Sequence, residues 1–483
     1  MQNPLSMSPG KTWRERRAFD YYIQHAAPLI GGLDVEFWST MVPQVCHAEP
    51  AVWDAIISIS ALFESYRPSN PTTKCQDALD WYLRSVSAIR HRIERGGVDV
   101  FVGLISCVLF ICIEALQGGT EEALQLYCQG NHLALTLRSQ ISRGHVSKST
   151  ALLLEDTIVP IFSRLSIIAN QQNKVAVGAL IRETDCACSP RFSSIKGARD
   201  TIYVLTAETQ QFQEACEHHH DSTNDFHVPP HLISRQLALL TRLESWHRCF
   251  QKLIESLPKN VSAQQKSIIG LLLTHHQMLH VINTTCISRF KITTDMCLSS
   301  FQAIVKQSQI SLQASARSDG SQPPFTLDIG VGFPIWFTVL RCAEPKIRRA
   351  ALALLRKSSH VQGFYTQAFG ASFGEAVMVV EESLAASINT EWSADTLFSP
   401  QSIMPGYMGT APTELAIRIP EEARIKPYGV FRPRDGLPPG IKTGDVGKWN
   451  VTPGQTFLQY SRNTCDPDTG TWRVVDEILP VNI

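Results

Sequence analysis

Three histidines lie close together near the middle of the chain, His275, His276 and His280. His276 and His280 are four residues apart, so a helix would place both imidazoles on one face, the spacing that helical metal sites use. The same imidazoles could exchange protons with a bound substrate. A metal would need one or two further ligands, and leucines surround the three histidines. We therefore expect core or interface histidines, and keep His276 and His280 as candidate metal ligands and all three as candidate ligand-pocket or acid–base residues.

Two other groups of potential metal ligands occur in sequence surroundings that do not suit a metal site. His218–His220 follow Cys216 and lead into a stretch of Ser, Thr, Asn and Asp, a composition typical of a solvated polar loop. Cys186 and Cys188 are separated by one residue, whereas zinc knuckles and redox motifs use two. The sequence predicts no metal at either group.

The motifs of the common enzyme classes are missing. The sequence contains no G-x-S-x-G elbow, no H-E-x-x-H helix and no G-x-x-x-x-G-K-[ST] loop, and Gly330-Val-Gly332 is only a fragment of a dinucleotide-binding motif. We therefore expect no cofactor. The residues favour a non-catalytic protein over an enzyme.

Composition and charge narrow the class of protein. Among 483 residues, 44 Lys and Arg balance 44 Asp and Glu, which excludes a nucleic-acid binder that works through overall positive charge. The basic cluster from Lys11 to Arg17 is too small for strong attachment to phosphates. Thirteen scattered cysteines and no leading signal peptide predict a reducing compartment, the nucleus or the cytoplasm. The longest apolar run, Val100–Ile113, has 14 residues, short of the roughly 20 that span a bilayer, so it predicts a buried core helix and no membrane.

Apolar residues recur with helical periodicity from about residue 14 to 390, after 13 residues that we expect to be flexible. This pattern predicts a mainly α protein, an irregular multi-helix bundle forming one all-helical domain over residues 14–390. Pro160 is expected to kink or split a helix over 149–170, and Pro345 to begin a helix over 345–357.

The segment 391–483 has a different character, because Pro and Gly are dense there. Thr456–Tyr460 and Thr471–Val475 are β-prone and are joined by a turn signal at Asp466-Pro-Asp. They predict a small β-hairpin, which would be marginal alone and is expected to pack on the helical body. Leu415–Ile419 is a third candidate strand.

Three stretches share a recognisable pattern. Arg16–Tyr66 contains an aromatic cluster, a Phe-Trp pair, Pro-Gln, then His and Glu-Pro-x-Val at a helix start. Leu104–Gln117 is an apolar helix followed by small residues around Gly130, and Pro334–Tyr365 closes the helical part. With the terminal hairpin, these stretches resemble the regulatory region of fungal zinc-cluster transcription factors, the fungal-specific transcription factor domain. The resemblance covers nearly the whole chain and implies a mainly α fold.

The resemblance also implies a role in transcription, with one departure from the family pattern. The family's DNA-binding part is a six-cysteine module, C-x2-C-x6-C repeated once, that ligates two zinc ions, and this spacing does not occur here. We therefore expect a transcription-regulator-like protein without its own DNA-binding module. It would act through protein partners or a small hydrophobic ligand in fungal metabolism, secondary metabolism included by analogy. The alternative is an enzyme of secondary metabolism on the same scaffold. Whether the chain forms a homodimer stays open.

Overall fold

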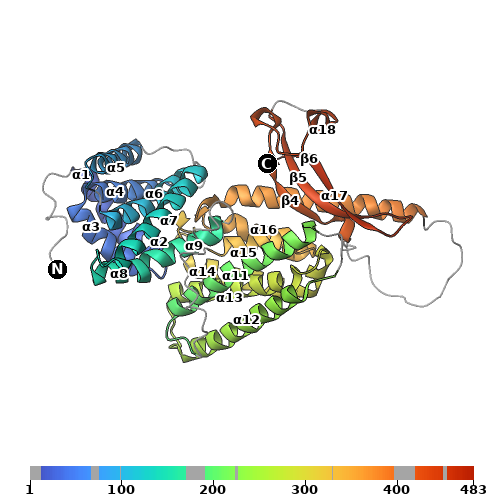
Figure 1. Ribbon diagram of the computed structural model, residues 1–483, viewed down its shortest axis with the longest axis horizontal. Coiled ribbons are helices and arrows are strands. Elements are labelled where there is room, and N and C mark those ends of the chain that lie inside the picture. Colours follow the sequence, from blue (N-terminus) through green and yellow to red (C-terminus); the bar gives the residue numbers. More distant parts are fainter. Residues whose placement is uncertain are drawn as a thin grey trace.

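The computed structural model describes residues 12–66, 76–97, 99–169, 191–222, 227–328, 330–395, 419–449 and 454–482. These residues are mainly helical and end in a small antiparallel sheet, which confirms the predicted fold class (Figure 1). Most of the predicted flexible N-terminus, residues 1–11, lies outside the described part.

The first group of helices, here called the N-terminal lobe, covers the described residues from 12 to 169 and lies at the left of Figure 1. Its α-helices are α1 (Trp13–Tyr21), α2 (Ala27–Gly31), α3 (Val42–Ala48), α4 (Pro50–Ser65), α5 (Gln76–Glu94), α6 (Val100–Gln117), α7 (Thr120–Ser142), α8 (Lys148–Leu153) and α9 (Val159–Ala169). Wider π-helical turns occur at Tyr22–Ala26, Phe37–Met41 and Leu154–Ile158. The last of these interrupts the helix directly before Pro160, as the missing N–H of proline predicts.

Helix α6 is the centre of the N-terminal lobe. The Asp99 side chain accepts a hydrogen bond from the Phe101 N–H at 2.8 Å and begins the helix, and Gly118 ends it with a left-handed φ of 82°. Of the described helices, α6 alone is long and apolar enough to cross a membrane, but 61% of it is buried inside the protein. Leu104, Val108 and Ile111 are fully buried, so the predicted core helix is confirmed.

The second group, here called the second lobe, contains the longer helices at the centre of Figure 1. They are α11 (Ile195–Ser222), α12 (Pro230–Ser256), α13 (Ala263–Thr285), α14 (Leu298–Ser315), α15 (Gly332–Arg341), α16 (Pro345–Lys357) and α17 (Gln367–Asp395), with a 3-10 segment at Lys291–Cys297. The polar loop predicted at His218–His220 is wrong, because α11 continues through them to Ser222. There the His219 and His220 rings contact the carbonyls of His227 and Ile287, each at 3.2 Å.

One irregular segment joins the two lobes. It is here called the connector and comprises the described residues 316–328, 330 and 331 between α14 and α15. Within it, β1 (Phe325–Thr326) pairs in parallel with β2 (Val361–Gln362), which pairs with β3 (Tyr365–Thr366). Phe325 and Leu327 pack into the hydrophobic core of the N-terminal lobe together with Val361 and Phe364. Residues of the second half of the chain therefore complete the core of the first.

The C-terminal sheet lies against α17. Its strands are β4 (Ile425–Phe431), β5 (Thr456–Cys465) and β6 (Trp472–Val481), antiparallel and in sequence order. Leu458 and Tyr460 pack against Val377 and Val380 of α17, so the predicted hairpin and its packing on the helical body are confirmed. The third strand is β4; of the strand predicted at Leu415–Ile419, residues 415–418 lie outside the described part and Ile419 is not in a strand.

Candidate functional site

The predicted histidines lie inside the second lobe. His275 is fully buried, its Nδ1 is 3.0 Å from the Leu271 carbonyl oxygen one turn earlier, and its ring meets Tyr203 edge-on. His276 is 5% exposed and stacks on His247 of α12 with ring centroids 4.6 Å apart. Burial lowers the pKa of His275 to about 4. Burial first, and then repulsion from His247 and His280, lowers the pKa of His276 to about 3. Both rings are therefore neutral at pH 7.

The surroundings of these histidines are those of packed side chains. His276 and His247 stack face to face, and His280 lies close enough to His276 to lower its pKa. Within the described ranges no group of three or more His, Cys, Asp and Glu side chains has the geometry to hold a metal ion. A substrate could not reach His275 or His276, because both are in the core.

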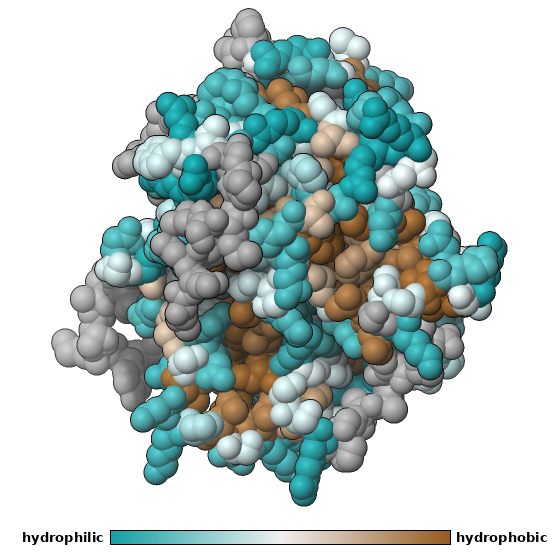
Figure 2. All heavy atoms as spheres, turned by 90° about the vertical axis from the view of Figure 1, so that its left-hand side faces the viewer, coloured by the Kyte–Doolittle hydropathy of each residue, from teal (hydrophilic) through white to brown (hydrophobic). Residues whose placement is uncertain are grey.

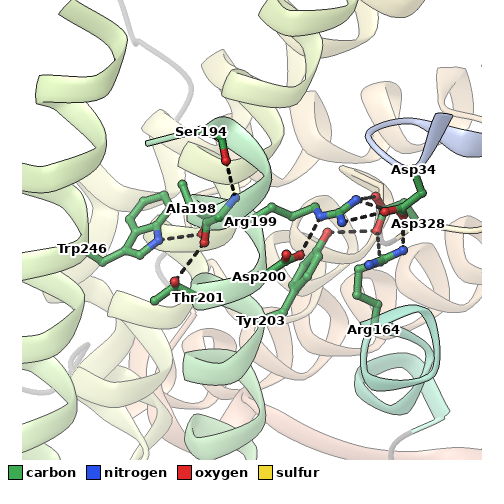
Figure 3. Close-up of polar contacts among 11 residues, drawn as sticks. Asp34, Arg164, Ser194, Ala198, Arg199, Asp200, Thr201, Tyr203, Trp246 and Asp328 are labelled. Atoms are coloured by element: carbon green, nitrogen blue, oxygen red, sulfur yellow. Dashed lines mark hydrogen bonds and ion pairs between the residues drawn. The ribbon is translucent and has the colours of Figure 1, made fainter. Parts of the chain in front are cut away.

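A buried charge cluster, defined as Asp34, Arg164, Arg199 and Asp328, joins four segments of the chain (Figure 3). Arg199 of α11 donates to both carboxylate oxygens of Asp34, at 2.9 and 3.1 Å. Arg164 of α9 bonds Asp34 and also lies 3.1 Å from Asp328 of the connector. Tyr203 adds a hydrogen bond of 3.3 Å to Asp328. The cluster therefore fixes the N-terminal lobe, α11 and the connector to one another.

Charge balance makes this burial tolerable. Arg199 is 1% exposed and Asp34 7%; within the cluster two cations meet two anions, and the half-exposed Asp200 also accepts from Arg199 at 3.1 Å. Burial opposes ionisation of Asp34, but the adjacent Arg164 and Arg199 outweigh it, and the pKa of Asp34 falls below its usual value. The sequence analysis missed the cluster, because its members are up to 294 positions apart and single Arg and Asp residues carry no spacing signal.

A cleft of about 830 Å³ lies beside the connector. Its walls come from α4, α14, the connector, α16, the β2 region and the first turn of α17, and include Tyr66, Leu312, Pro324, Leu354, His360 and Ala371. The volume is within the range of small-molecule sites, which favour junctions between structural units. No sequence pattern predicts the cleft, because its walls come from elements distant in sequence.

Aromatic and neutral polar groups dominate the cleft. The rings of Tyr66 and His360 are in contact, with centroids 4.9 Å apart. Burial raises the pKa of Tyr66 to about 12 and lowers the pKa of His360 below its usual value, so at pH 7 the phenol is protonated and the imidazole neutral. Four Gln and three Ser side chains add neutral donors and acceptors. These groups suit binding of an organic molecule better than a reaction that needs a charged nucleophile.

Comparisons with known proteins give no further identification. The chain matches no family model, no curated protein and no solved structure. The resemblance to the fungal-specific transcription factor domain therefore rests on the residues named above.

Proposed function

We propose that the chain is a regulatory protein of the fungal transcription-factor type, which responds to a small ligand and acts through protein partners. The observation that carries the proposal is the position of the cleft at the junction of the two lobes. Tyr66 directly follows α4 of the N-terminal lobe, whereas the remaining walls belong to the second lobe and the connector. A ligand bound there contacts both lobes, and a ligand can shift an equilibrium only by binding one arrangement better than another.

The connector provides a physical route from the cleft to the buried charge cluster. Pro323 and Pro324 line the cleft, the next two residues form β1, and Asp328 contributes to the cluster. A displacement of the connector by a bound ligand would change the contacts of Asp328 with Arg164 and Arg199. Through these arginines it would reach α9 and α11.

Contact with protein partners is supported by apolar side chains on the surface of the N-terminal lobe. Figure 2, which views that end of the molecule, shows hydrophobic areas between the polar ones. Trp13 is 72% exposed, Ile93 62% and Leu152 61%. Large exposed apolar areas often mark protein interaction sites. Because the printed sequence lacks the six-cysteine spacing, we expect DNA contact to come from a partner.

The regulatory proposal is tested by tethering. The chain is fused to an unrelated DNA-binding domain and expressed in a fungal host with a reporter gene. We expect reporter output to differ from that of the DNA-binding domain alone, and Ala368→Trp, which fills the cleft, to change the response. A fusion that leaves the reporter at the baseline under all metabolic conditions tested contradicts the proposal.

Two companion measurements address the alternatives. In an anisotropy titration at physiological salt, the chain alone should show no tight sequence-specific binding to genomic fragments. For the enzyme alternative, the purified chain is incubated with host extracts and the products are measured by mass spectrometry. Conversion of a metabolite by the wild type and not by Ala368→Trp would favour the enzyme over the regulator.

A further inference from the structure

We infer that the cleft is built for an aromatic anion: a planar organic molecule with one acidic group, such as a carboxylate or phenolate. This inference rests on the proposed function, because it names the ligand class of the same cleft. It depends on the distribution of charge around the cleft, on the aromatic pair and on two polar groups left without partners.

The charged side chains that line the cleft are cations, and two carboxylates, Glu375 and Asp319, bond the lining residues Arg356 and Ser321. Arg356 and Lys357 line it, and among its described lining residues there is no Asp or Glu. Arg356 is paired with Glu375 at 2.5 Å, but Lys357 has no carboxylate partner in the described part of the chain. The first turn of α17 also faces the cleft through Gln367 and Ala368, and the N-terminus of a long helix carries partial positive charge. An anionic group is therefore favoured.

Partnerless polar atoms occur at the same junction. The hydroxyl of Tyr66 is buried and has no hydrogen-bond partner among the described residues. Arg317, directly after the lining residue Ala316, covers the Phe63 ring at 5.5 Å, and its Nε and Nη2 are also buried and unpaired within that part. Buried polar atoms are normally hydrogen-bonded. The Tyr66 hydroxyl is covered in this arrangement, so a bound ligand must displace the side chains over it before the protonated phenol can donate to an anionic oxygen.

The other walls of the cleft are aromatic and apolar, which accounts for the apolar part of the ligand. Tyr66 and His360 present an aromatic pair, and Leu312, Leu354 and Pro324 add apolar surface. Planar rings pack well against such surfaces. A purely inorganic anion would leave this apolar wall uncovered, whereas an aromatic acid contacts both kinds of wall.

The experiment compares two fluorescent probes that differ in charge. 8-Anilinonaphthalene-1-sulfonate carries one negative charge, and N-phenyl-1-naphthylamine has the same rings and none. Titration of the full chain should give a Kd about two- to fivefold lower for the anionic probe, the effect of one partly exposed charge contact. Lys357→Gln should remove most of this preference and leave the Kd of the uncharged probe unchanged. Tyr66→Phe should weaken the binding of the anionic probe more than the binding of the uncharged probe.

Two control variants locate the binding. Lys346→Gln removes an exposed lysine from the other end of α16, outside the cleft, and should change neither Kd. Ala368→Trp fills the cleft from an exposed lining position and should abolish binding of both probes, with circular dichroism unchanged. Equal affinities of the wild type for the two probes, an unchanged preference in Lys357→Gln, or full binding by Ala368→Trp would each overturn the inference. The proposed function fails separately, if the bound anionic probe leaves hydrogen exchange in α9 and α11 unchanged.

Discussion

The substitution Asp34→Asn tests whether the buried charge cluster holds the two lobes together. It removes a buried anion that contacts two arginines, of which Arg199 is 1% exposed. Breaking a buried ion pair by removing one partner typically costs about 3–5 kcal/mol, because the remaining charge is left uncompensated. Asp328 stays close to both arginines, at 3.1 Å from Arg164 and 3.5 Å from Arg199. We therefore expect a loss near the lower limit, about 3 kcal/mol.

The assay is denaturant unfolding followed by tryptophan fluorescence, with the slope checked for unchanged cooperativity. Asp77→Asn is the matched control, because Asp77 pairs with Arg14 at 3.3 Å on the surface, where the two side chains are 43% and 69% exposed. Surface pairs contribute about 1 kcal/mol or less. A loss for Asp34→Asn no larger than that for Asp77→Asn would refute the reasoning.

The dependence of stability on pH provides an independent check on the charge of Asp34. The pKa of Asp34 is lowered on folding, so its contribution is present above the unfolded pKa and is lost as the pH falls through the folded pKa. The stability difference between wild type and Asp34→Asn should therefore be constant near neutral pH and shrink in strong acid. A difference that grows on acidification would contradict this assignment of charge.

Two further predictions concern packing and a buried lysine. Gly130→Ala should destabilise the protein by about 1–3 kcal/mol, because the added Cβ would lie 2.3 Å from the Phe162 ring. In the control Gly197→Ala the added Cβ has no atom closer than 3.5 Å, so this variant should be neutral or stabilising in thermal unfolding. Equal effects of the two substitutions would contradict the close packing at Gly130. Burial, and then repulsion from Arg341, lowers the pKa of Lys291 to about 7. Between pH 7 and about 10 the unfolded chain binds one more proton at Lys291 than the folded chain does. The free energy of unfolding of the wild type should therefore rise with pH, relative to that of Lys291→Met, by up to ~1.4 kcal/mol per pH unit. Parallel stability profiles of the two proteins against pH would rule this out.

Features set by local sequence could be predicted. The helix expected at 345–357 begins at Pro345 and ends at Lys357 in the structure, because proline suits a first helical turn and one apolar stripe continues to its end. The hairpin follows from a local turn, in which the Asp466 side chain accepts hydrogen bonds from the N–H groups of Asp468 and Thr469 at 3.0 and 3.1 Å.

Features that depend on distant partners could not be predicted. Arg348 is expected beside the apolar stripe of its helix, yet it is fully buried and lies 2.7 Å from Glu381 of α17. Its burial depends on a carboxylate 33 positions away, which periodicity within one helix does not show. The spacing of His276 and His280 is ambiguous, because residues four apart can serve a helical metal site or a packed helical face; in the structure His276 is buried and His280 is half-buried.

Under the proposed function, the connector would link the cleft to the charge cluster. Ala316 and Pro324 line the cleft, Phe325 packs in the N-terminal core, and Asp328 reaches both arginines. Twelve positions separate the first of these residues from the last. A ligand that moves the cleft wall must therefore either strain the β1 pairing or shift Asp328, whose charge-assisted contacts depend strongly on distance. Coupling through this segment needs no long chain of intermediates, so substitutions in the connector should alter communication between the lobes while leaving the ligand-contacting groups of α16 and α17 in place.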